Sequence, residues 1–462
     1  MGRPPSTSRL ARGTQIGGVV ANQAWRKRRA RLAMIGRSAE VRARIADEQV
    51  LAMATQMVRV LGDLKGLAMK FGQFLSMFDL ELVPPEHREG FQQQLAALRD
   101  RAPAVDFAAI SAVIEEDLGA PTEHWFADFD PVPIAAASIG QVHRARLADG
   151  TEVVVKVQYP GIDQAVRADL RNIGLLRGMV AQLVPGFTVA VFDEFRTHIE
   201  SELDYLAEAR TQQHVAELYR DHPFICVPQA FPELSSRRVL VTEYAPGLDF
   251  AAMRELPAAE RDRIGEIVYR FYVGSLFELS EFCGDPHPGN ILLRDDGRVV
   301  FLDFGLYKRM DAAALDVERT CLRAAAEERV ADLYRLLVAA GIVDESAGVS
   351  AAEAFDYVLS ASQWCLVDDE LPITPELACG AVLLAIDPRL AQFAGMKRQN
   401  LPPEHLLSRR ADLHTFGLLG QLRATANWHR IAREWLYGDP PQTECGVLHQ
   451  NWKAARTPQP VD

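Results

Sequence analysis

The stretch Cys283-Gly284-Asp285-Pro286-His287-Pro288-Gly289-Asn290 is followed by two short apolar runs and then by Asp303-Phe304-Gly305. The apolar runs are Ile291–Leu293 and Val299–Leu302, and Asp295-Asp296-Gly297 lies between them. Short β-branched and apolar runs on either side of an Asp/Gly cluster predict two strands joined by a tight turn. The sequence therefore predicts a hairpin with a polar loop at each end.

Three polar residues of these loops match the needs of phosphoryl transfer, which are a carboxylate near the acceptor and oxygen ligands for Mg²⁺ on the phosphates. Asp285 and Asn290, five residues apart, fit a catalytic-loop pair, and Asp303 fits a metal-holding aspartate. Taken singly, the first two would be turn residues and Asp303 a helix N-cap. In this order around a hairpin, they predict ATP and Mg²⁺ as cofactors, with Asp285 catalytic and with Asn290 and Asp303 as metal ligands.

Upstream, the apolar run Val153–Val157 contains Lys156, which suits a strand lysine that binds the α- and β-phosphates. The alternative is an edge-strand charge that faces solvent. A helix is predicted from about Asp193 to Tyr219, and positions 200, 204 and 208 would share one of its faces. Glu208 is the predicted partner of Lys156, and Glu200 is expected to be solvated.

Two further segments are predicted to contact the nucleotide. Ala135, Ala136, Ala137 and Ser138 occupy the place of a phosphate-covering loop, although alanine replaces most of the glycine and limits close approach to a phosphate. Read alone, this is an ordinary Ala-rich turn. Glu243 and Tyr244 fit a hinge that contacts adenine, an assignment that rests on position alone.

The segment after Gly305 argues against a peptide substrate. A helical pattern begins near Asp311, no Ala-Pro-Glu follows, and no room remains for a long activation segment. His287 is expected to hold its loop through a hydrogen bond to the backbone rather than to take part in chemistry.

The organisation of the chain predicts an α+β, two-lobed, protein-kinase-like fold with a small β-containing N-lobe, a helical C-lobe and an N-terminal helical extension. Tryptophans 364, 428, 435 and 452 are expected in the core. The predicted segments are a basic, partly disordered stretch (1–38), the helical extension (39–131), the N-lobe (132–250), the C-lobe (251–440) and an irregular tail (441–462).

Composition favours a cytoplasmic protein. The six cysteines form no CxxC pair, which favours reduced thiols over disulfides or zinc. No apolar run approaches the roughly 18 residues of a membrane span, and the N-terminus lacks the apolar core of a secretory signal.

Charge is unevenly distributed. Residues 1–44 hold eleven Lys/Arg and one acidic residue, although the whole chain carries −12. This segment, densest at Arg26–Arg31, suits a peripheral contact with an anionic membrane; the alternative is a solvated arm. The acidic remainder disfavours nucleic acid as a partner.

From about Leu64 to Lys308, the order of these motifs resembles the UbiB-like (Coq8-like) family of atypical kinases. Lys70-Phe71-Gly72-Gln73 is similar to the family's KxGQ motif, and Glu202-Leu203-Asp204 to its ExD motif. The resemblance implies that the KxGQ extension folds over the peptide site and that Lys70 pairs with the ExD acids, Glu202 and Asp204. It also implies ATPase activity linked to isoprenoid-quinone or lipid metabolism. The apolar C-terminal hairpin of many ubiquinone-linked bacterial members is not evident in this sequence.

Three functions remain open from the sequence. The first is an ATPase that drives the handling of a small lipid or quinone precursor. The second is a small-molecule phosphotransferase, because Gly284–Asn290 also resembles the aminoglycoside and choline kinase loop. The third is a nucleotide-binding pseudokinase scaffold. The KxGQ and ExD motifs favour the first function, and the complete set of site residues argues against the third.

Overall fold

The computed structural model describes residues 105–137, 139–171, 193, 196–197, 199–378, 380 and 402–456. The chain divides into two compact units, Met1–Pro103 with Gly161–Arg196, and Ala104–Pro160 with Thr197–Asp462. The second unit contains every described residue of the predicted site. The predicted basic segment, the predicted KxGQ residues Lys70, Gly72 and Gln73, and Ser138 lie outside the described residues.

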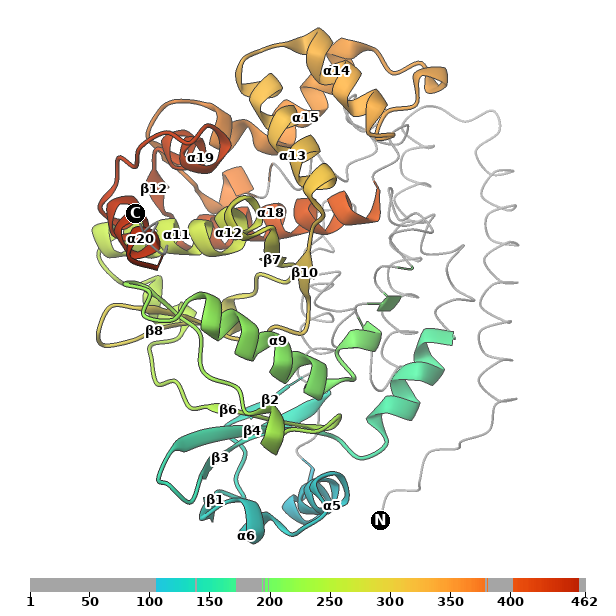
Figure 1. The fold of residues 1–462 in the computed structure, drawn as a ribbon, viewed down its shortest axis with the longest axis vertical. Coiled ribbons are helices and arrows are strands. Elements are labelled where there is room, and N and C mark those ends of the chain that lie inside the picture. The colour runs from blue at the N-terminus through green and yellow to red at the C-terminus, as the bar shows by residue number, and fades with distance from the viewer. Residues whose placement is uncertain are drawn as a thin grey trace, which may run out of the picture. The chain divides into compact units, whose positions relative to one another are not determined.

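The N-terminal part of the second unit contains an antiparallel sheet in the order β1-β3-β4-β6, with β2 also paired to β3 (Figure 1). Predicted strands at 153–157 and 239–244 are confirmed as β4 and β6. The bounds of the five strands are β1 Asp128–Phe129, β2 Ala135–Ala136, β3 Gly140–Arg146, β4 Glu152–Gln158 and β6 Val239–Glu243.

One face of this sheet packs on α5 (Phe107–Leu118). Val153, Val155 and Val157 of β4 are fully buried in this apolar cluster. Because successive side chains of a strand point to opposite faces, Lys156 points to the face away from α5. The alternation of side chains along β4 therefore places the valines in the N-lobe core and the predicted phosphate-binding lysine on the opposite face.

Two expectations about this region need correction. The predicted boundary between extension and N-lobe at residues 131/132 lies too late, because α5 and β1 are part of the sheet's own core and the second unit begins at Ala104. The Ala-rich segment is not a plain turn. Ala135 and Ala136 form β2, which pairs with Val142 and Gln141.

Gly140, where β3 begins, allows the two central strands to approach closely. A Cβ at this position would lie 2.2 Å from the carbonyl oxygen of Val157. No side chain fits at that distance, so the close approach of β3 to β4 requires glycine here.

The C-terminal part of the second unit is helical, as predicted, and lies at the opposite end of the unit from the sheet (Figure 1). Its strands are short, and they pair as β7 with β10, β8 with β9, β5 with β9 and β11 with β12. Besides α5, the α-helices of the second unit include α6 Thr122–Trp125, which precedes the sheet, and α9 Tyr205–Leu218, which precedes β6. The helices that follow are α10 Phe250–Met253, α11 Ala258–Tyr269, α12 Ser275–Leu279, α13 Ala312–Ala326, α14 Val330–Ala339, α15 Ala351–Leu366, α18 Pro403–Leu422, α19 Trp428–Leu436 and α20 Glu444–Arg456. The short strands are β5 Ile225–Cys226, β7 Glu281–Cys283, β8 Ile291–Leu293, β9 Val299–Phe301, β10 Tyr307–Arg309, β11 Leu371–Pro372 and β12 Thr425–Ala426.

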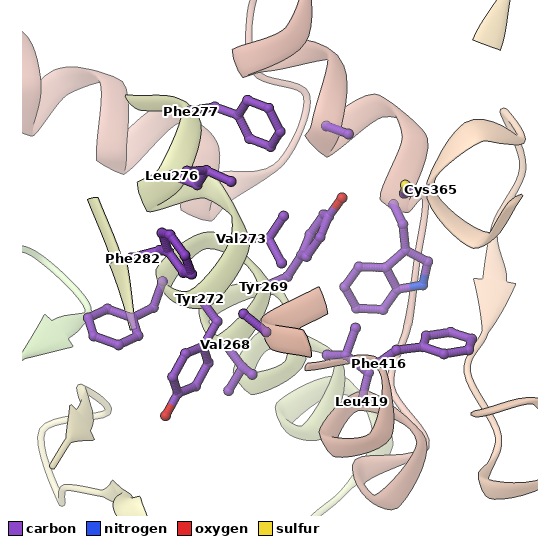
Figure 2. Close-up of a cluster of buried hydrophobic side chains, with 14 of the residues drawn as sticks. Val268, Tyr269, Tyr272, Val273, Leu276, Phe277, Phe282, Cys365, Phe416 and Leu419 are labelled. Carbon is purple, nitrogen blue, oxygen red and sulfur yellow. The ribbon is translucent and has the colours of Figure 1, made fainter. Parts of the chain in front are cut away.

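An aromatic cluster forms the centre of this helical core (Figure 2). The Tyr269 ring meets those of Trp364, Trp428 and Trp435 edge-on, at centroid separations of 5.0, 5.5 and 5.3 Å. Such edge-to-face pairs add to the stabilisation from burial. These three tryptophans confirm the predicted core, and Trp452 packs against it from a partly buried position.

Two general properties follow from the described residues. Within them, no helix is both long and apolar enough to cross a membrane. The described cysteines, Cys226, Cys283, Cys321, Cys365 and Cys445, are free thiols.

The predicted irregular tail is wrong at residues 444–456, which form α20. A row of buried polar side chains attaches this helix. His449 Nδ1 lies 2.9 Å from His222 Nε2, and His449 Nε2 lies 2.9 Å from Glu278 Oε2. His222 Nδ1 accepts the backbone N–H groups of Phe224 and Ile225, so its proton is on Nε2 and is donated to His449. The order of donors and acceptors is thus determined from His222 through His449 to Glu278.

These contacts make stability depend on pH. Burial and the neighbouring His449 lower the pKa of His222 to about 2. Burial alone would raise the pKa of Glu278, but the His449 hydrogen bond and the Lys453 ammonium lower it to about 2. Below about pH 6.5, His222 therefore binds more protons in the unfolded chain than in the folded chain. Below about pH 4.5, the same is true of Glu278.

We expect the free energy of unfolding to fall as pH drops below about 6.5, by up to about 1.4 kcal/mol per pH unit from His222 alone. Urea denaturation at pH 5.5 and 7.5 measures the effect. His222→Asn, whose amide oxygen can still accept the two N–H groups, should flatten the dependence. His124→Asn, on an exposed residue of α6, is the matched control. An equal pH dependence in the wild type and in His222→Asn would contradict the assignment.

Candidate active site

Two antiparallel ladders enclose the predicted catalytic loop and the Asp303-Phe304-Gly305 segment. The predicted hairpin is confirmed as β8 paired with β9, with Ile291 opposite Phe301. On the other side, β7 pairs with β10, with Cys283 opposite Tyr307. Residues 284–290 and 302–306 thus form two loops that are joined at both ends by backbone hydrogen bonds.

This arrangement brings Asn290 and Asp303 to the same end of the hairpin. Asn290 directly precedes β8, and its carbonyl accepts the backbone N–H of Leu302 at 2.9 Å. Asp303 is the next residue and has a φ of +65°. Asp tolerates this left-handed region better than most residues, and a non-glycine residue held there marks a backbone determined by its surroundings. Its Oδ1 accepts the N–H of Gly305 at 3.2 Å.

Lys156 lies between two carboxylates. Its Nζ is 3.2 Å from Glu208 Oε1 and 3.7 Å from Asp303 Oδ2. The ammonium also lies 4.8 Å from the centroid of the Tyr205 ring. The predicted pairing of Lys156 with Glu208 is present in the structure, and the edge-strand alternative does not apply because the side chain is engaged.

Burial dominates the electrostatics of this group. It raises the pKa of Glu208 to about 7, against the opposing effect of Lys156. Burial alone would lower the pKa of the Lys156 ammonium, but the charges of Glu208 and Asp303 raise it well above its usual range. The lysine therefore remains a cation, and a partly buried cation held by carboxylates is well placed to receive phosphate oxygens.

The helix that carries Glu208 begins later than predicted. Residues 202–204 form a turn, so positions 200, 204 and 208 do not share a face of one continuous helix. The Asp204 side chain accepts the N–H of Ala207 at 3.0 Å and is the N-cap of α9. Asp favours this role over a helix interior because its carboxylate satisfies an end N–H group. The cap places Glu208 in the first turn of α9, beside Lys156.

Glu202, the other ExD acid, lies close to the Asp303-Phe304-Gly305 segment. A Cβ on Gly305 would lie 3.9 Å from Glu202 Cγ, 3.7 Å from Glu208 Oε2 and 3.4 Å from Asp303 Oδ1. The neighbouring Ser201 hydroxyl donates to the Gly305 carbonyl at 3.3 Å. The ExD motif thus adjoins the predicted metal site, while its expected pairing with Lys70 lies outside the described residues.

Both predicted nucleotide-contact segments form backbone hydrogen bonds within the protein. Ala135, Ala136 and Ala137 belong to the edge hairpin of β2 and β3, and Ala137 N–H donates to the Gly140 carbonyl at 2.8 Å. At the hinge, Glu243 N–H donates to the Gln229 carbonyl and Tyr244 N–H to the Glu152 carbonyl. Because those two N–H groups bind protein, an adenine at this hinge would have to use other backbone groups.

The predicted catalytic loop is held by one of its own residues and by two residues of α18. His287 Nδ1 accepts the N–H of Gly289 at 3.0 Å, which confirms the expected structural role of this histidine. Asp285 receives a hydrogen bond from Arg410 of α18, with Nη2 2.8 Å from Oδ1. His414 Nδ1 lies 3.9 Å from the same oxygen. Sequence reasoning missed Arg410 and His414, which carry no local motif.

The residues present fit a magnesium nucleotide. Asn290 and Asp303 offer the hard oxygen ligands that Mg²⁺ prefers, at one end of one hairpin, and the Asp303 side chain is 38% exposed. Lys156 adds a cation beside Asp303, where phosphate oxygens would also meet the metal. Asp285 stands on the neighbouring loop, where an acceptor hydroxyl or water would lie.

Comparison with known proteins identifies a family for this chain. The ABC1 atypical kinase-like domain matches residues 97–335. The chloroplastic protein ACTIVITY OF BC1 COMPLEX KINASE 8 of Arabidopsis thaliana is 35% identical over 247 residues, which cover 51% of this chain and 32% of the relative. Mitochondrial atypical kinase COQ8B of Rattus norvegicus is 34% identical over 278 residues, which cover 60% of this chain and 52% of the relative. The chain thus spans about a third to a half of the length of these relatives.

Among solved structures, Rv3197 of Mycobacterium tuberculosis, determined as a complex with erythromycin, is 31% identical with a TM-score of 0.60. The match covers 85% of this chain and 98% of that chain. The matched domain spans Lys156, Glu208, Asp285, Asn290 and Asp303. The chain belongs to the ABC1 atypical kinase-like family, also called the UbiB family, and has its kinase-like fold.

Proposed function

We propose that this protein is a Mg²⁺-dependent ATP-consuming enzyme that acts on a small lipid or isoprenoid-quinone precursor rather than on protein chains. The observation that carries the proposal is the position of Lys156 Nζ, 3.2 Å from Glu208 and 3.7 Å from Asp303. A cation held between a helix carboxylate and a metal-binding aspartate is the arrangement that kinase-like phosphoryl transfer requires.

Each site residue has a distinct role in this proposal. Lys156 binds phosphate oxygens, and Glu208 holds the lysine in place. Asn290 and Asp303 hold Mg²⁺, which neutralises charge on the phosphates when bound. Asp285 orients the water or hydroxyl that receives the phosphoryl group. The protein takes little part in covalent chemistry, because positioning of the reactants and stabilisation of charge supply most of the rate enhancement.

The choice of a non-peptide acceptor rests on residues 306–311. In protein kinases, the segment after the metal-holding Asp-Phe-Gly leads into the activation loop. Here β10 starts two residues after Gly305 and pairs with β7, and Asp311 already caps α13. The family resemblance supplies the class of acceptor, an isoprenoid or lipid. A phosphotransferase for another small molecule and a nucleotide-binding scaffold are the competing outcomes of the test.

The test is phosphate release from ATP with and without Mg²⁺ and anionic liposomes, comparing the wild type with Asp303→Asn. Asparagine tolerates the left-handed backbone of Asp303 but supplies one oxygen and no charge. We expect Mg²⁺-dependent turnover to fall by on the order of 10²-fold or more, with an unchanged melting temperature. Asp303→Ala should lose activity and about 1 kcal/mol of stability as well.

Turnover in the wild type that both variants lose would support the enzyme. No turnover in the wild type, together with Mg²⁺-ATP binding, would favour the scaffold. Turnover retained by Asp303→Asn would contradict the assignment of Asp303 as a metal ligand.

Lys156→Met tests the phosphate contact. The uncharged side chain fills a similar space on β4, so we expect a folded protein whose turnover is reduced by on the order of 10²-fold. Lys453→Met is the control and should keep wild-type turnover, because Lys453 of α20 is an exposed residue whose ion-pair partner is Glu278 of α12. Steady-state kinetics with a melting curve for each protein measure both properties. Wild-type rates in folded Lys156→Met would remove the lysine from the mechanism.

The basic segment at residues 1–44 is predicted to make a peripheral contact with an anionic membrane. Reversing the charge of Arg26, Lys27, Arg28 and Arg29 should abolish sedimentation with anionic liposomes, because each basic residue near an anionic surface contributes about 1 kcal/mol. Neutral liposomes are the control. Unchanged sedimentation of the charge-reversed protein would eliminate this contact.

A further inference from the structure

An arginine from a distant helix binds the catalytic aspartate. Arg410 Nη2 lies 2.8 Å from Asp285 Oδ1, although 125 residues separate the two in sequence. His414, four residues after Arg410 and therefore on the same face of α18, lies 3.9 Å from the same oxygen. One face of α18 thus meets the loop that supplies the predicted acceptor-orienting carboxylate.

Buried polar contacts elsewhere on α18 determine its rotation. Glu318 of α13 accepts hydrogen bonds from His405 Nδ1 at 2.8 Å and from Ser408 Oγ at 2.7 Å. Arg409 Nη1 donates to Ser362 Oγ of α15 at 3.2 Å. Glu318, His405, Ser408 and Ser362 are all buried, so turning the helix would leave several polar groups unsatisfied. The direction in which Arg410 points is therefore a property of the C-lobe core.

His414 holds the backbone of the same loop. It makes a hydrogen bond to the Pro286 backbone, directly after Asp285. Burial and the nearby Arg410 lower its pKa to about 4, so it is neutral near pH 7. The carboxylate and the following peptide group are thus both anchored to α18.

The partial exposure of the Arg410–Asp285 ion pair favours an orienting role over a stabilising one. The side chains of Arg410 and Asp285 are 21% and 26% exposed, so the pair lies at the margin of the site and not in the core. Ion pairs that water reaches contribute little to stability, whereas bonding to a planar guanidinium restricts how a carboxylate is turned. The hydrogen bond from Arg410 therefore acts mainly on the orientation of the Asp285 carboxylate.

We propose that Arg410 is a positioning residue for phosphoryl transfer, which orients the Asp285 carboxylate toward the acceptor while His414 holds the loop backbone. The inference rests on the proposed ATP-consuming function. It identifies α18, which lies outside the matched family domain at residues 97–335, as part of the catalytic apparatus. Neither Arg410 nor His414 contacts Lys156 or Asp303 in the described structure, so nucleotide binding should not depend on Arg410.

The experiment compares Arg410→Gln and Arg410→Lys with the wild type, using kcat for phosphate release and the Kd for Mg²⁺-ATP. We expect Arg410→Gln to lower kcat by about 10- to 100-fold, because a misplaced catalytic group costs rate at this scale. The Kd should stay within about threefold, because the phosphate-binding residues are untouched. Arg410→Lys, which keeps the charge, should recover kcat to within about tenfold of the wild type.

A double-mutant cycle separates positioning from folding. In an Asp285→Asn background, Arg410→Gln should lower kcat no further, because the carboxylate it orients is gone. Arg430→Gln is the matched control and should leave kcat unchanged, because Arg430 of α19 forms an exposed ion pair with Asp368. If Arg410→Gln does not fold, Arg410→Lys completes the same cycle with Asp285→Asn.

Wild-type kcat in folded Arg410→Gln would overturn the positioning role while leaving the ATP-consuming function intact. An equal loss in the wild-type and Asp285→Asn backgrounds would also overturn it, since the effect would then not pass through the carboxylate. Absence of Mg²⁺-dependent turnover in the wild type would instead remove the proposed function, and this inference with it.

Discussion

The Lys156 ammonium is a partly buried cation that lies between two carboxylates, Glu208 and Asp303, and the surrounding elements are arranged about this contact. β4 has three valines buried against α5 on one face, so the lysine emerges on the other. α9 brings Glu208 to it because Asp204 caps the helix one turn earlier. The hairpin β8–β9 brings Asp303. Loss of both carboxylates would leave a partly buried ammonium without an anionic partner, which is costly.

The second constraint is the pair of ladders around the catalytic loop. β7–β10 and β8–β9 are each only three residues long, yet together they join residues 284–290 to residues 302–306 at both ends. Asp303 is held at a φ of +65° within this frame. A residue in that region is maintained when its surroundings determine the backbone, and here backbone hydrogen bonds on both sides do so.

Much of this could be predicted from sequence because the decisive residues are close together or sit in strong local patterns. Asp285, Asn290 and Asp303 flank one hairpin, and Lys156 interrupts a run of valines. The start of α9 could not be predicted, because an aspartate four residues before Glu208 fits a helix face as well as an N-cap. The polar sequence of α20 gives a weak helical signal, and its stability comes from His449 meeting His222 across 227 residues. Arg410 leaves no local signal, since its importance lies entirely in a contact that only the fold creates.

The β7–β10 pairing has a consequence for control of the enzyme. Many kinases are switched on when phosphorylation orders a loop beyond the metal-binding aspartate and moves a helix so that its glutamate meets the lysine. In this chain the corresponding backbone is already in a ladder, and Lys156 already meets Glu208. The structure thus contains the ordered backbone and the lysine–glutamate contact that phosphorylation produces in those kinases. Under the proposed function, the supply of nucleotide and acceptor would set the activity, rather than phosphorylation of a loop beyond Asp303.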